Sequence, residues 1–267
     1  MRNLAELMNL KGRTAIVTGG AGHVGSAIAD AVAELGAAVA IVDFQESQVS
    51  EVCESLRTRY AVKTASLVVD LADEHAVRGI PTRVVDALGG VDILINCAAL
   101  VGVSALEGWA TGFLDQSSAT WRRALEVNLT APFVLTQACT PALRESKHGT
   151  VINIGSIYGM VGPDMDLYTG TRLGNPAAYA ASKGGLIQLT RWLSTTLAPC
   201  VRANSISLGG VWRNQPESFH AKYTARTPLG RMATEEDVKG AVAYLSSDLS
   251  AYVTGQNLVV DGGWTAW

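Results

Sequence analysis

Tyr179 and Lys183 are the pair of residues whose types and spacing most directly suggest chemistry. They stand in the stretch Tyr-Ala-Ala-Ser-Lys. Four residues apart on a helix, the two side chains project from one face and can meet. A phenol is a weak acid near neutral pH, and a fixed ammonium beside it stabilises the phenolate. The pair can therefore move a proton to or from an alcohol oxygen.

Two further polar residues are candidates for the same site. Ser156 ends the apolar run GTVINIGS, and open α/β folds bind ligands at the carboxyl ends of their strands. An ordinary turn serine is the other interpretation. Asn128 lies inside a helical pattern, where its amide competes for backbone groups. It therefore has either a functional role or a simple hydrogen bond within the helix.

Gly19, Gly22 and Gly25 follow the apolar run TAIVT and open a helical stretch. Glycine permits the tight turn and the close approach of a pyrophosphate, which the helix N-terminus attracts. This setting between strand and helix predicts a dinucleotide site that includes His23 and Val24. An ordinary glycine-rich turn is the alternative.

Asp43 ends the second apolar run, about 20 residues after the glycine turn, as in dinucleotide-binding folds. A carboxylate there accepts hydrogen bonds from the adenosine ribose and repels a 2′-phosphate. Phe44 follows it, and the glycine turn holds no Arg or Lys. The pattern predicts NAD rather than NADP, with a solvated aspartate as the alternative. Asp70, at the end of the third run, could accept from the adenine amino group or serve as a turn residue.

Strand-like apolar runs alternate with stretches of helical period. The runs span 13–18, 37–43, 64–70, 91–96, 149–156, 201–207 and 256–261, and helical stretches span 26–36, 73–90, 121–146 and 178–199. Continuous apolar strands are typical of sheets buried on both faces. The alternation predicts one α/β domain over residues 1–267, with a parallel sheet between helices. Asn175 is predicted to cap the last helix, with Pro176 at its first position.

Composition excludes several classes of protein. The sequence is 48% hydrophobic and 17% charged, with a net charge of −3, so it has no basic footprint for nucleic acid. Its four cysteines form no CxxC pair, which argues against a metal site. With no leader pattern or membrane-length apolar run, a reduced cytoplasmic compartment is expected.

These features together resemble the short-chain dehydrogenase/reductase family, of the single-domain type. The resemblance runs from about Leu10 to Trp264 on the motifs TGGAGHVG (18–25), Asp43, Asp70, NCAA (96–99), Asn128, Ser156, Tyr179 with Lys183, and YVTGQNLVVDGG. It implies a Rossmann-like, doubly wound, seven-stranded parallel sheet. It also implies Tyr179 as general acid/base and Ser156 as the residue that orients the substrate oxygen. Lys183 would hold the nicotinamide ribose and lower the phenol pKa, and Asn128 would position a water behind it.

The resemblance also implies larger sets of contacts. The cofactor-binding set is Gly19, Gly22, His23, Val24, Gly25, Asp43, Phe44, Asp70, Leu71, Asn96, Ala98, Tyr179, Lys183, Gly209 and Val211. The substrate set is Ser156, Tyr158, Arg172 and Trp212. A homotetramer, or a homodimer, is expected as the assembly.

The sequence departs from the family pattern at several positions. His23 stands where the usual TGxxxGxG has glycine, and NCAA replaces NNAG. Leu208 replaces the proline of the Pro-Gly pair that normally follows the sixth strand. Arg213 or Asn214 stands where a threonine often holds the nicotinamide carboxamide. The sequence therefore leaves the contacts at the nicotinamide end open.

An insertion at about 160–175 lengthens the gap between Ser156 and Tyr179 and is predicted to lie at the mouth of the site. Its hydroxyl-rich and charged side chains are Asp164, Asp166, Tyr168, Thr169, Thr171 and Arg172. They suit a hydroxyl-rich substrate; a subunit-contact loop is the alternative. The cations Arg213, His220, Lys222 and Arg226 suggest an anionic substrate or a solvated basic face. The insertion resembles those of dehydrogenases in bacterial surface-sugar and flagellin-glycan pathways.

The sequence thus predicts an NAD(H)-dependent oxidoreductase acting on a secondary alcohol or ketone, with a sugar or sugar nucleotide as one candidate substrate. Two other functions stay open. One is an NAD-sensing or scaffold protein without turnover. The other is a sugar epimerase or dehydratase with tightly bound NAD.

Overall fold

Seven parallel strands form one sheet in the computed structural model, which describes residues 1–102, 104 and 106–267. The strands are β1 (Thr14–Thr18), β2 (Ala38–Asp43), β3 (Thr64–Val68), β4 (Ile93–Asn96), β5 (Thr150–Ser156), β6 (Arg202–Leu208) and β7 (Asn257–Val260). Their spatial order is β3-β2-β1-β4-β5-β6-β7, so the chain reverses direction across the sheet between β1 and β4. The predicted doubly wound, seven-stranded sheet is confirmed. Ligands of such sheets bind at the carboxyl ends of the strands beside this reversal.

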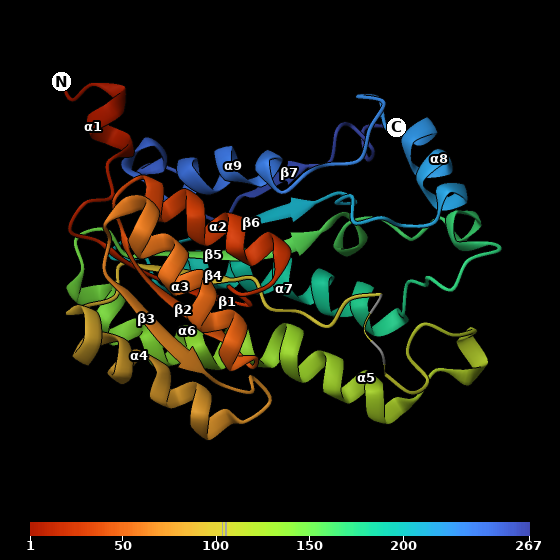
Figure 1. The fold of residues 1–267 in the computed structure, drawn as a ribbon, viewed down its shortest axis with the longest axis horizontal. Coiled ribbons are helices and arrows are strands. Elements are labelled where there is room, and N and C mark those ends of the chain that lie inside the picture. Colours follow the sequence, from red (N-terminus) through yellow and green to blue (C-terminus); the bar gives the residue numbers. More distant parts are fainter. Residues whose placement is uncertain (103, 105) are drawn as a thin grey trace.

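Helices cover both faces of the sheet (Figure 1). On one face lie α2 (His23–Glu34), α3 (Glu46–Tyr60) and α9 (Glu236–Ser246); on the other lie α4 (Glu74–Leu88), α6 (Ala131–Glu145) and α7 (Ala177–Thr196). Successive strand side chains point to opposite faces. In β1, for example, Val17 joins the α2 core and Ile16 joins the α4 core. The continuous apolar runs therefore fill two cores at once.

The long helix predicted over 121–146 is divided in the structure. It consists of α5 (Ser118–Leu125), a π-helical turn (Glu126–Thr130) and α6. Pro132 lies in the first turn of α6, where the lack of a backbone N–H costs the fewest helical hydrogen bonds. Such π turns are frequent at functional sites, and this one carries Asn128.

The predicted cap of α7 is wrong. The helix begins at Ala177 and its N-cap is Pro176, which supplies no side-chain cap. Asn175 instead turns its amide toward the insertion, where Nδ2 donates to the hydroxyl of Tyr168 at 3.5 Å. Tyr179 and Lys183 nevertheless lie in the first two turns of α7, as predicted.

Other helices were not predicted from the sequence. They are α1 (Leu4–Met8), α3, α8 (Glu217–Arg226) and α9, with short 3-10 turns at Phe113–Asp115, Ile157–Gly159, Met165–Tyr168 and Asp248–Ser250. The turn Met165–Tyr168 gives the insertion a structure of its own. Across the described part of the chain, no helix has both the length and the apolar character that a membrane span requires.

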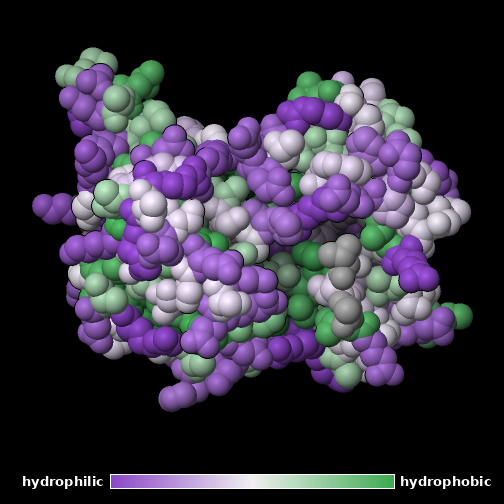
Figure 2. Space-filling view, viewed as in Figure 1, coloured by the Kyte–Doolittle hydropathy of each residue, from purple (hydrophilic) through white to green (hydrophobic). Residues whose placement is uncertain are grey.

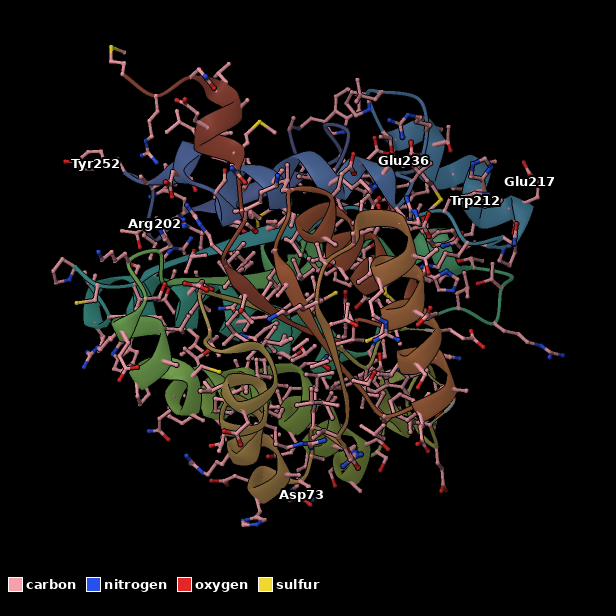
Figure 3. All side chains as sticks on the ribbon, turned by 60° about the vertical axis from the view of Figure 1, so that its left-hand side comes forward. Asp73, Arg202, Trp212, Glu217, Glu236 and Tyr252 are labelled. Atoms are coloured by element: carbon pink, nitrogen blue, oxygen red, sulfur yellow. The ribbon has the colours of Figure 1, made fainter. Side chains whose placement is uncertain are left out.

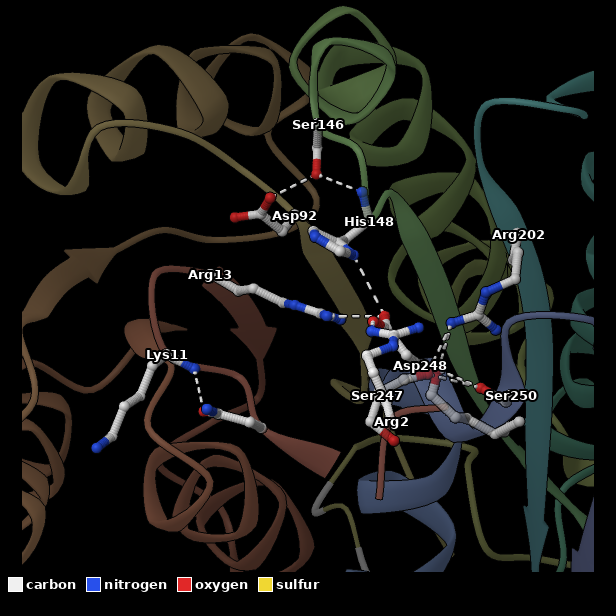
Figure 4. A network of polar contacts seen from close by, with 12 residues as sticks. Arg2, Lys11, Arg13, Asp92, Ser146, His148, Arg202, Ser247, Asp248 and Ser250 are labelled. Carbon is white, nitrogen blue, oxygen red and sulfur yellow. Dashed lines mark hydrogen bonds and ion pairs between the residues drawn. The ribbon is translucent and has the colours of Figure 1, made fainter. Parts of the chain in front are cut away.

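The amino end of the sheet is held by an ionic network around Asp248 (Figure 4). Its carboxylate accepts hydrogen bonds from Arg2 and, at 2.7 Å, from Nη2 of Arg13, and it lies 3.2 Å from Nδ1 of His148. Arg202, the first residue of β6, lies at this end, whereas Trp212, which follows β6, lies at the opposite end of the molecule (Figure 3). The Asp248 network and Trp212, a candidate site residue, thus lie at opposite ends of the molecule.

Candidate active site

Tyr179, Lys183 and Ser156 meet at the carboxyl end of β5. Lys183 is only 3% exposed, and its Nζ donates to the carbonyl oxygen of Ile154 at 2.7 Å. The same Nζ lies 5.9 Å from the centroid of the Tyr179 ring. Ser156 ends β5; its Oγ accepts from the backbone N–H of Tyr158 at 3.2 Å, and its hydroxyl lies near enough to that of Tyr179 to lower the Tyr179 pKa. The helix and the strand therefore place a phenol, an ammonium and a hydroxyl around one point.

Burial dominates the electrostatics of these groups. It raises the pKa of Tyr179, although the hydrogen bond with Ser156 opposes that rise. Burial also lowers the pKa of Lys183 to about 8, an effect that Cys97 partly offsets. Tyr179 is consequently protonated and ready to donate at neutral pH. Lys183 titrates close to neutral pH, as is common for groups at functional sites.

Asn128 is fully buried in the π-helical turn and holds two segments together. Its Oδ1 accepts from the backbone N–H of Leu100 at 2.7 Å, and its Nδ2 donates to the Leu100 carbonyl at 3.0 Å and to the Ser182 hydroxyl at 3.1 Å. It thus ties the segment after β4 to α7, beside Lys183. Its predicted role toward a water behind Lys183 stays a prediction.

The glycine turn is shaped so that only glycine fits at two positions. Gly19 has a φ of +65°, and a Cβ on it would lie 2.7 Å from Cα of Ala98. A Cβ on Gly25 would lie 1.9 Å from the carbonyl oxygen of Gly19. Gly22, the N-cap of α2, brings no side chain, so the first N–H groups of the helix, at His23 and beyond, face outward uncapped. This cradle fits a pyrophosphate.

Asp43 lies directly over this turn. Its Oδ2 accepts from the backbone N–H of Ala21 at 3.1 Å, and its Oδ1 accepts from that of Phe44 at 2.8 Å. The Phe44 side chain is exposed. The carboxylate therefore sets a negative charge beside the cradle, where an adenosine ribose would lie.

Asp70 has partners of its own at the end of the third strand region. Its Oδ1 accepts from the N–H of Ala72 at 2.9 Å, and its carboxylate pairs with Arg123 at 3.0 Å. Asp70 thus has the predicted role of a turn residue. An adenine amino group would have to bind the same carboxylate that already pairs with Arg123. Leu71 packs against the core on the α4 face.

Sequence reasoning missed Thr18, the residue immediately before the glycine turn. Its Oγ1 accepts from the backbone N–H groups of Cys97 at 3.1 Å and Ala98 at 3.3 Å. This contact joins the end of β1 to the end of β4 and sets the floor of the cradle. Its only signal in the sequence is a hydroxyl at the strand end.

The side chain of Asn96 lies in a buried polar network, and its predicted cofactor contact stays a prediction. Asn96 is buried, and its Nδ2 donates to Oδ1 of Asn153 at 2.8 Å. Asn153 in turn donates to the hydroxyl of Thr190 at 2.8 Å. The Nδ2 of Asn96 thus belongs to a polar network between β4, β5 and α7.

The segment after β6 is braced from both sides. The N–H of Gly209 donates to the carbonyl of Val260 at 2.9 Å, and Val211 bridges to Ala233. Gln215 accepts from the N–H of Arg213 at 2.7 Å and donates to the Val211 carbonyl at 2.8 Å. These contacts hold a fixed loop beside the cradle.

An aromatic wall forms the other side of the site. The hydroxyl of Tyr168 donates to that of Tyr158 at 3.1 Å, and Tyr158 meets Trp264 edge-on, with ring centroids 6.0 Å apart. Trp212 lies against His220, with ring centroids 4.4 Å apart.

Arg172 is exposed on the insertion, and no hydrogen bond joins it to the other predicted substrate residues. Figure 2 shows a hollow to the right of centre, toward the α8 end of the molecule.

Two of the four predicted cations already have partners on the insertion. Arg226 pairs with Asp164, and Nζ of Lys222 donates to the carbonyl of Asp166 at 2.7 Å. Both contacts fasten the insertion to α8. In this structure these two cations position the insertion, and the expectation that they receive a substrate anion stays a prediction.

Two other features do not define the site. A cavity of about 380 Å³ opens beside the start of α7, lined by Trp109, Phe113, Trp121 and neighbours. Its lining includes neither Ser156 nor Tyr179, so the reaction site lies elsewhere. Among the described residues, no cluster of His, Cys, Asp and Glu could hold a metal ion.

Comparison with known proteins places this geometry among enzymes. Residues 19–265 match the family model described as Enoyl-(Acyl carrier protein) reductase. The chain is 30% identical to the 3-oxoacyl-[acyl-carrier-protein] reductase FabG of Aquifex aeolicus over 261 residues, 96% of this chain and 98% of that protein.

Solved structures agree along the whole length. A short-chain type dehydrogenase/reductase from Mycobacterium marinum superposes with a TM-score of 0.87 at 28% identity, covering 100% of both chains. A gluconate 5-dehydrogenase from Burkholderia cenocepacia, in complex with NADP and tartrate, superposes with a TM-score of 0.88 at 27% identity. It covers 99% of this chain and 100% of that one.

Proposed function

Because the chain belongs to the short-chain dehydrogenase/reductase family of oxidoreductases that act on alcohol groups, we propose that it interconverts a secondary alcohol and a ketone with NAD(H). The observation that carries the proposal is the convergence of Ser156, Tyr179 and Lys183, with Lys183 fixed 2.7 Å from the Ile154 carbonyl.

The residues present fit a nicotinamide dinucleotide. The glycine-only contact between Gly19 and Ala98 leaves room for a pyrophosphate against the start of α2, and Asp43 faces the ribose position. When bound, the cofactor supplies or accepts the hydride. Lys183 would hold its nicotinamide ribose, and the backbone of Val211 would face the nicotinamide end.

The chain's own residues handle the proton. In reduction, Tyr179 donates its phenolic proton to the carbonyl oxygen of the substrate, and in oxidation it takes the proton back. Ser156 orients that oxygen through its hydroxyl. Lys183 stabilises the phenolate that Tyr179 becomes. Asn128 keeps α7 and the segment after β4 in register.

NAD over NADP is our proposal for the cofactor. The Asp43 carboxylate would lie against a 2′-phosphate, and the glycine turn carries no cation to offset the repulsion. The Burkholderia relative was solved with NADP. The preference must therefore come from this residue and not from the fold.

For the substrate we propose a small hydroxyl-rich molecule, such as a sugar or sugar acid. The hydroxyl of Tyr168 contacts the Tyr158 hydroxyl and the Asn175 amide, and the backbone N–H of Tyr158 donates to Ser156. The Burkholderia relative is a gluconate 5-dehydrogenase. The resemblance to surface-sugar enzymes stays a prediction, as does the cytoplasmic location.

A screen tests the reaction. Sugars, sugar acids, sugar phosphates and nucleotide sugars are mixed with the enzyme and NAD or NADH, and NADH absorbance is followed. Stoichiometric change in absorbance supports an oxidoreductase. Binding of NADH without turnover of any ligand would favour a sensor or scaffold. Product formation with constant absorbance would favour an epimerase or dehydratase that retains its NAD.

A further inference from the structure

Arg213 differs from the other charged residues at the mouth of the site. Its side chain is 33% exposed, and its closest acid is Glu235, with Nε and Oε1 separated by 3.9 Å. That separation is too long for a hydrogen bond. The guanidinium donates no hydrogen bond to any described residue, although its backbone is fixed by Gln215.

The neighbouring cations contrast with it. Arg226 pairs with Asp164 and lies over the Trp264 ring, Lys222 donates to the Asp166 carbonyl, and Arg231 makes two bonds to Asp237. A guanidinium has five N–H donors in a planar fork that matches carboxylate and phosphate oxygens. The guanidinium of Arg213 is partly exposed, and its donors have no acceptor among the described residues.

The position of Arg213 brings its guanidinium near both parts of the proposed reaction site. Glu235 also lies 3.9 Å from Nδ1 of His23, the first residue of α2, so the Arg213 side chain approaches the glycine turn. The positive charge of Arg213 also lowers the pKa of both Cys97 and Tyr179, against the larger effect of burial. Arg213 thus lies between the pyrophosphate cradle and the catalytic phenol.

We propose that the Arg213 guanidinium is an anion-binding group of the active site, which receives a carboxylate or phosphate oxygen of a bound ligand. The inference rests on the proposed reaction site. Glu235 serves as the counterion when the ligand is absent. The anion has two sources, the pyrophosphate of the cofactor or an acidic group of the substrate, and Arg213 is placed to meet either.

Two binding titrations separate these sources. ADP-ribose carries the pyrophosphate without the nicotinamide, and its affinity for the free enzyme is measured by calorimetry. Tartrate carries carboxylates, and its affinity is measured on the enzyme–NADH complex, with threitol as the uncharged match. Arg213→Gln should weaken one of these anions about tenfold or more, as expected for loss of a charge-assisted hydrogen bond. Arg213→Lys should restore part of the loss.

Controls keep the result specific. Lys147→Gln removes the same charge from the exposed loop before β5, at the opposite end of the sheet, and should leave both affinities within about twofold. Glu235→Gln removes the competing acid and should tighten the anion that Arg213 binds. Adenosine, which lacks phosphate, should bind all variants alike.

The outcomes divide cleanly. Weakened ADP-ribose assigns Arg213 to the cofactor pyrophosphate, and weakened tartrate assigns it to the substrate. The proposal is overturned if Arg213→Gln binds ADP-ribose as tightly as the wild type does and tartrate gives no contrast. Tartrate gives no contrast if both proteins bind it equally or if the wild type does not bind it. The titrations need no turnover, so failure of the proposed reaction would appear separately, as absence of NADH oxidation in the substrate screen.

Discussion

The Lys183 ammonium donates to the carbonyl oxygen of Ile154, with 2.7 Å between Nζ and O. This contact crosses from α7 to β5 and holds the charge beside the Tyr179 ring. Lys183 is buried and Tyr179 is half-buried; burial lowers the pKa of Lys183 and raises that of Tyr179. The proposed catalysis therefore depends on the protonation states of Lys183 and Tyr179.

The first prediction is a loss of reductase activity as pH rises through about 8. Burial lowers the pKa of Lys183 to about 8. Below that pH the ammonium is charged and Tyr179 is protonated, as reduction requires. Above it, the ammonium loses its charge and the phenolate loses its support. kcat/KM for ketone reduction, which reports the free enzyme, should be level at low pH and fall above pH 8. A level profile to pH 10 would contradict this account of Lys183.

The second prediction concerns Asp43. Asp43→Ala removes a carboxylate that faces the ribose position and bonds to the Ala21 N–H. NADH affinity should fall by roughly tenfold to a hundredfold, since a hydrogen bond to a charged group contributes about 1.5–3 kcal/mol. NADPH affinity should fall less or rise. Fluorescence titration of both cofactors measures the change. A wild type that binds NADPH more tightly than NADH would rule out the proposed preference.

The third prediction concerns the insertion. Tyr168→Phe removes the hydroxyl that bonds to Tyr158 and Asn175. KM for the substrate should rise roughly twofold to tenfold, the effect of one neutral hydrogen bond, while NADH affinity stays unchanged. Tyr60→Phe is the matched control, because its hydroxyl bonds to Asp30, in the ion-pair cluster on α2.

A larger change tests the same segment. Replacement of 161–172 by a short Gly-Ser linker should raise KM further or abolish turnover, with NADH binding preserved. If kinetics on the identified substrate are unchanged and the oligomer dissociates, the insertion is a subunit contact instead.

The fourth prediction is assembly into a homotetramer. Phe133 on α6 and Trp192 on α7 are exposed in the single chain, the latter by 55%. Exposed aromatic surface on long helices is typical of interfaces between subunits. Light scattering at micromolar concentration should give four chains, and Trp192→Glu should lower the mass. A wild-type monomer would contradict the expectation.

The regular parts of the molecule could be predicted from the sequence because their signals are local. Continuous apolar runs indicated all seven strands, and the spacing of Tyr179 and Lys183 placed both on one helix face. The π-helical turn at Asn128 could not be read from the sequence, because the pattern of a helix continues through it.

Contacts between distant segments were also hidden. Nothing in the sequence shows that Arg226 pairs with Asp164 while Arg213 lacks a hydrogen-bond acceptor, since both were simply cations in one basic stretch. Asn175 was misjudged for the same reason: its local signal favoured a cap, but a tertiary partner on the insertion prevailed.

The most direct test of the account is the turnover of Tyr179→Phe. This substitution removes only the hydroxyl that donates the proton, and the ring and Lys183 remain in place. We predict that kcat falls by about 10²–10⁴-fold, the contribution of general acid–base catalysis. NADH affinity, measured by fluorescence on the same preparation, should stay within about twofold of the wild type, since no cofactor charge is lost. A Tyr179→Phe enzyme with near-normal kcat would contradict the proposed mechanism.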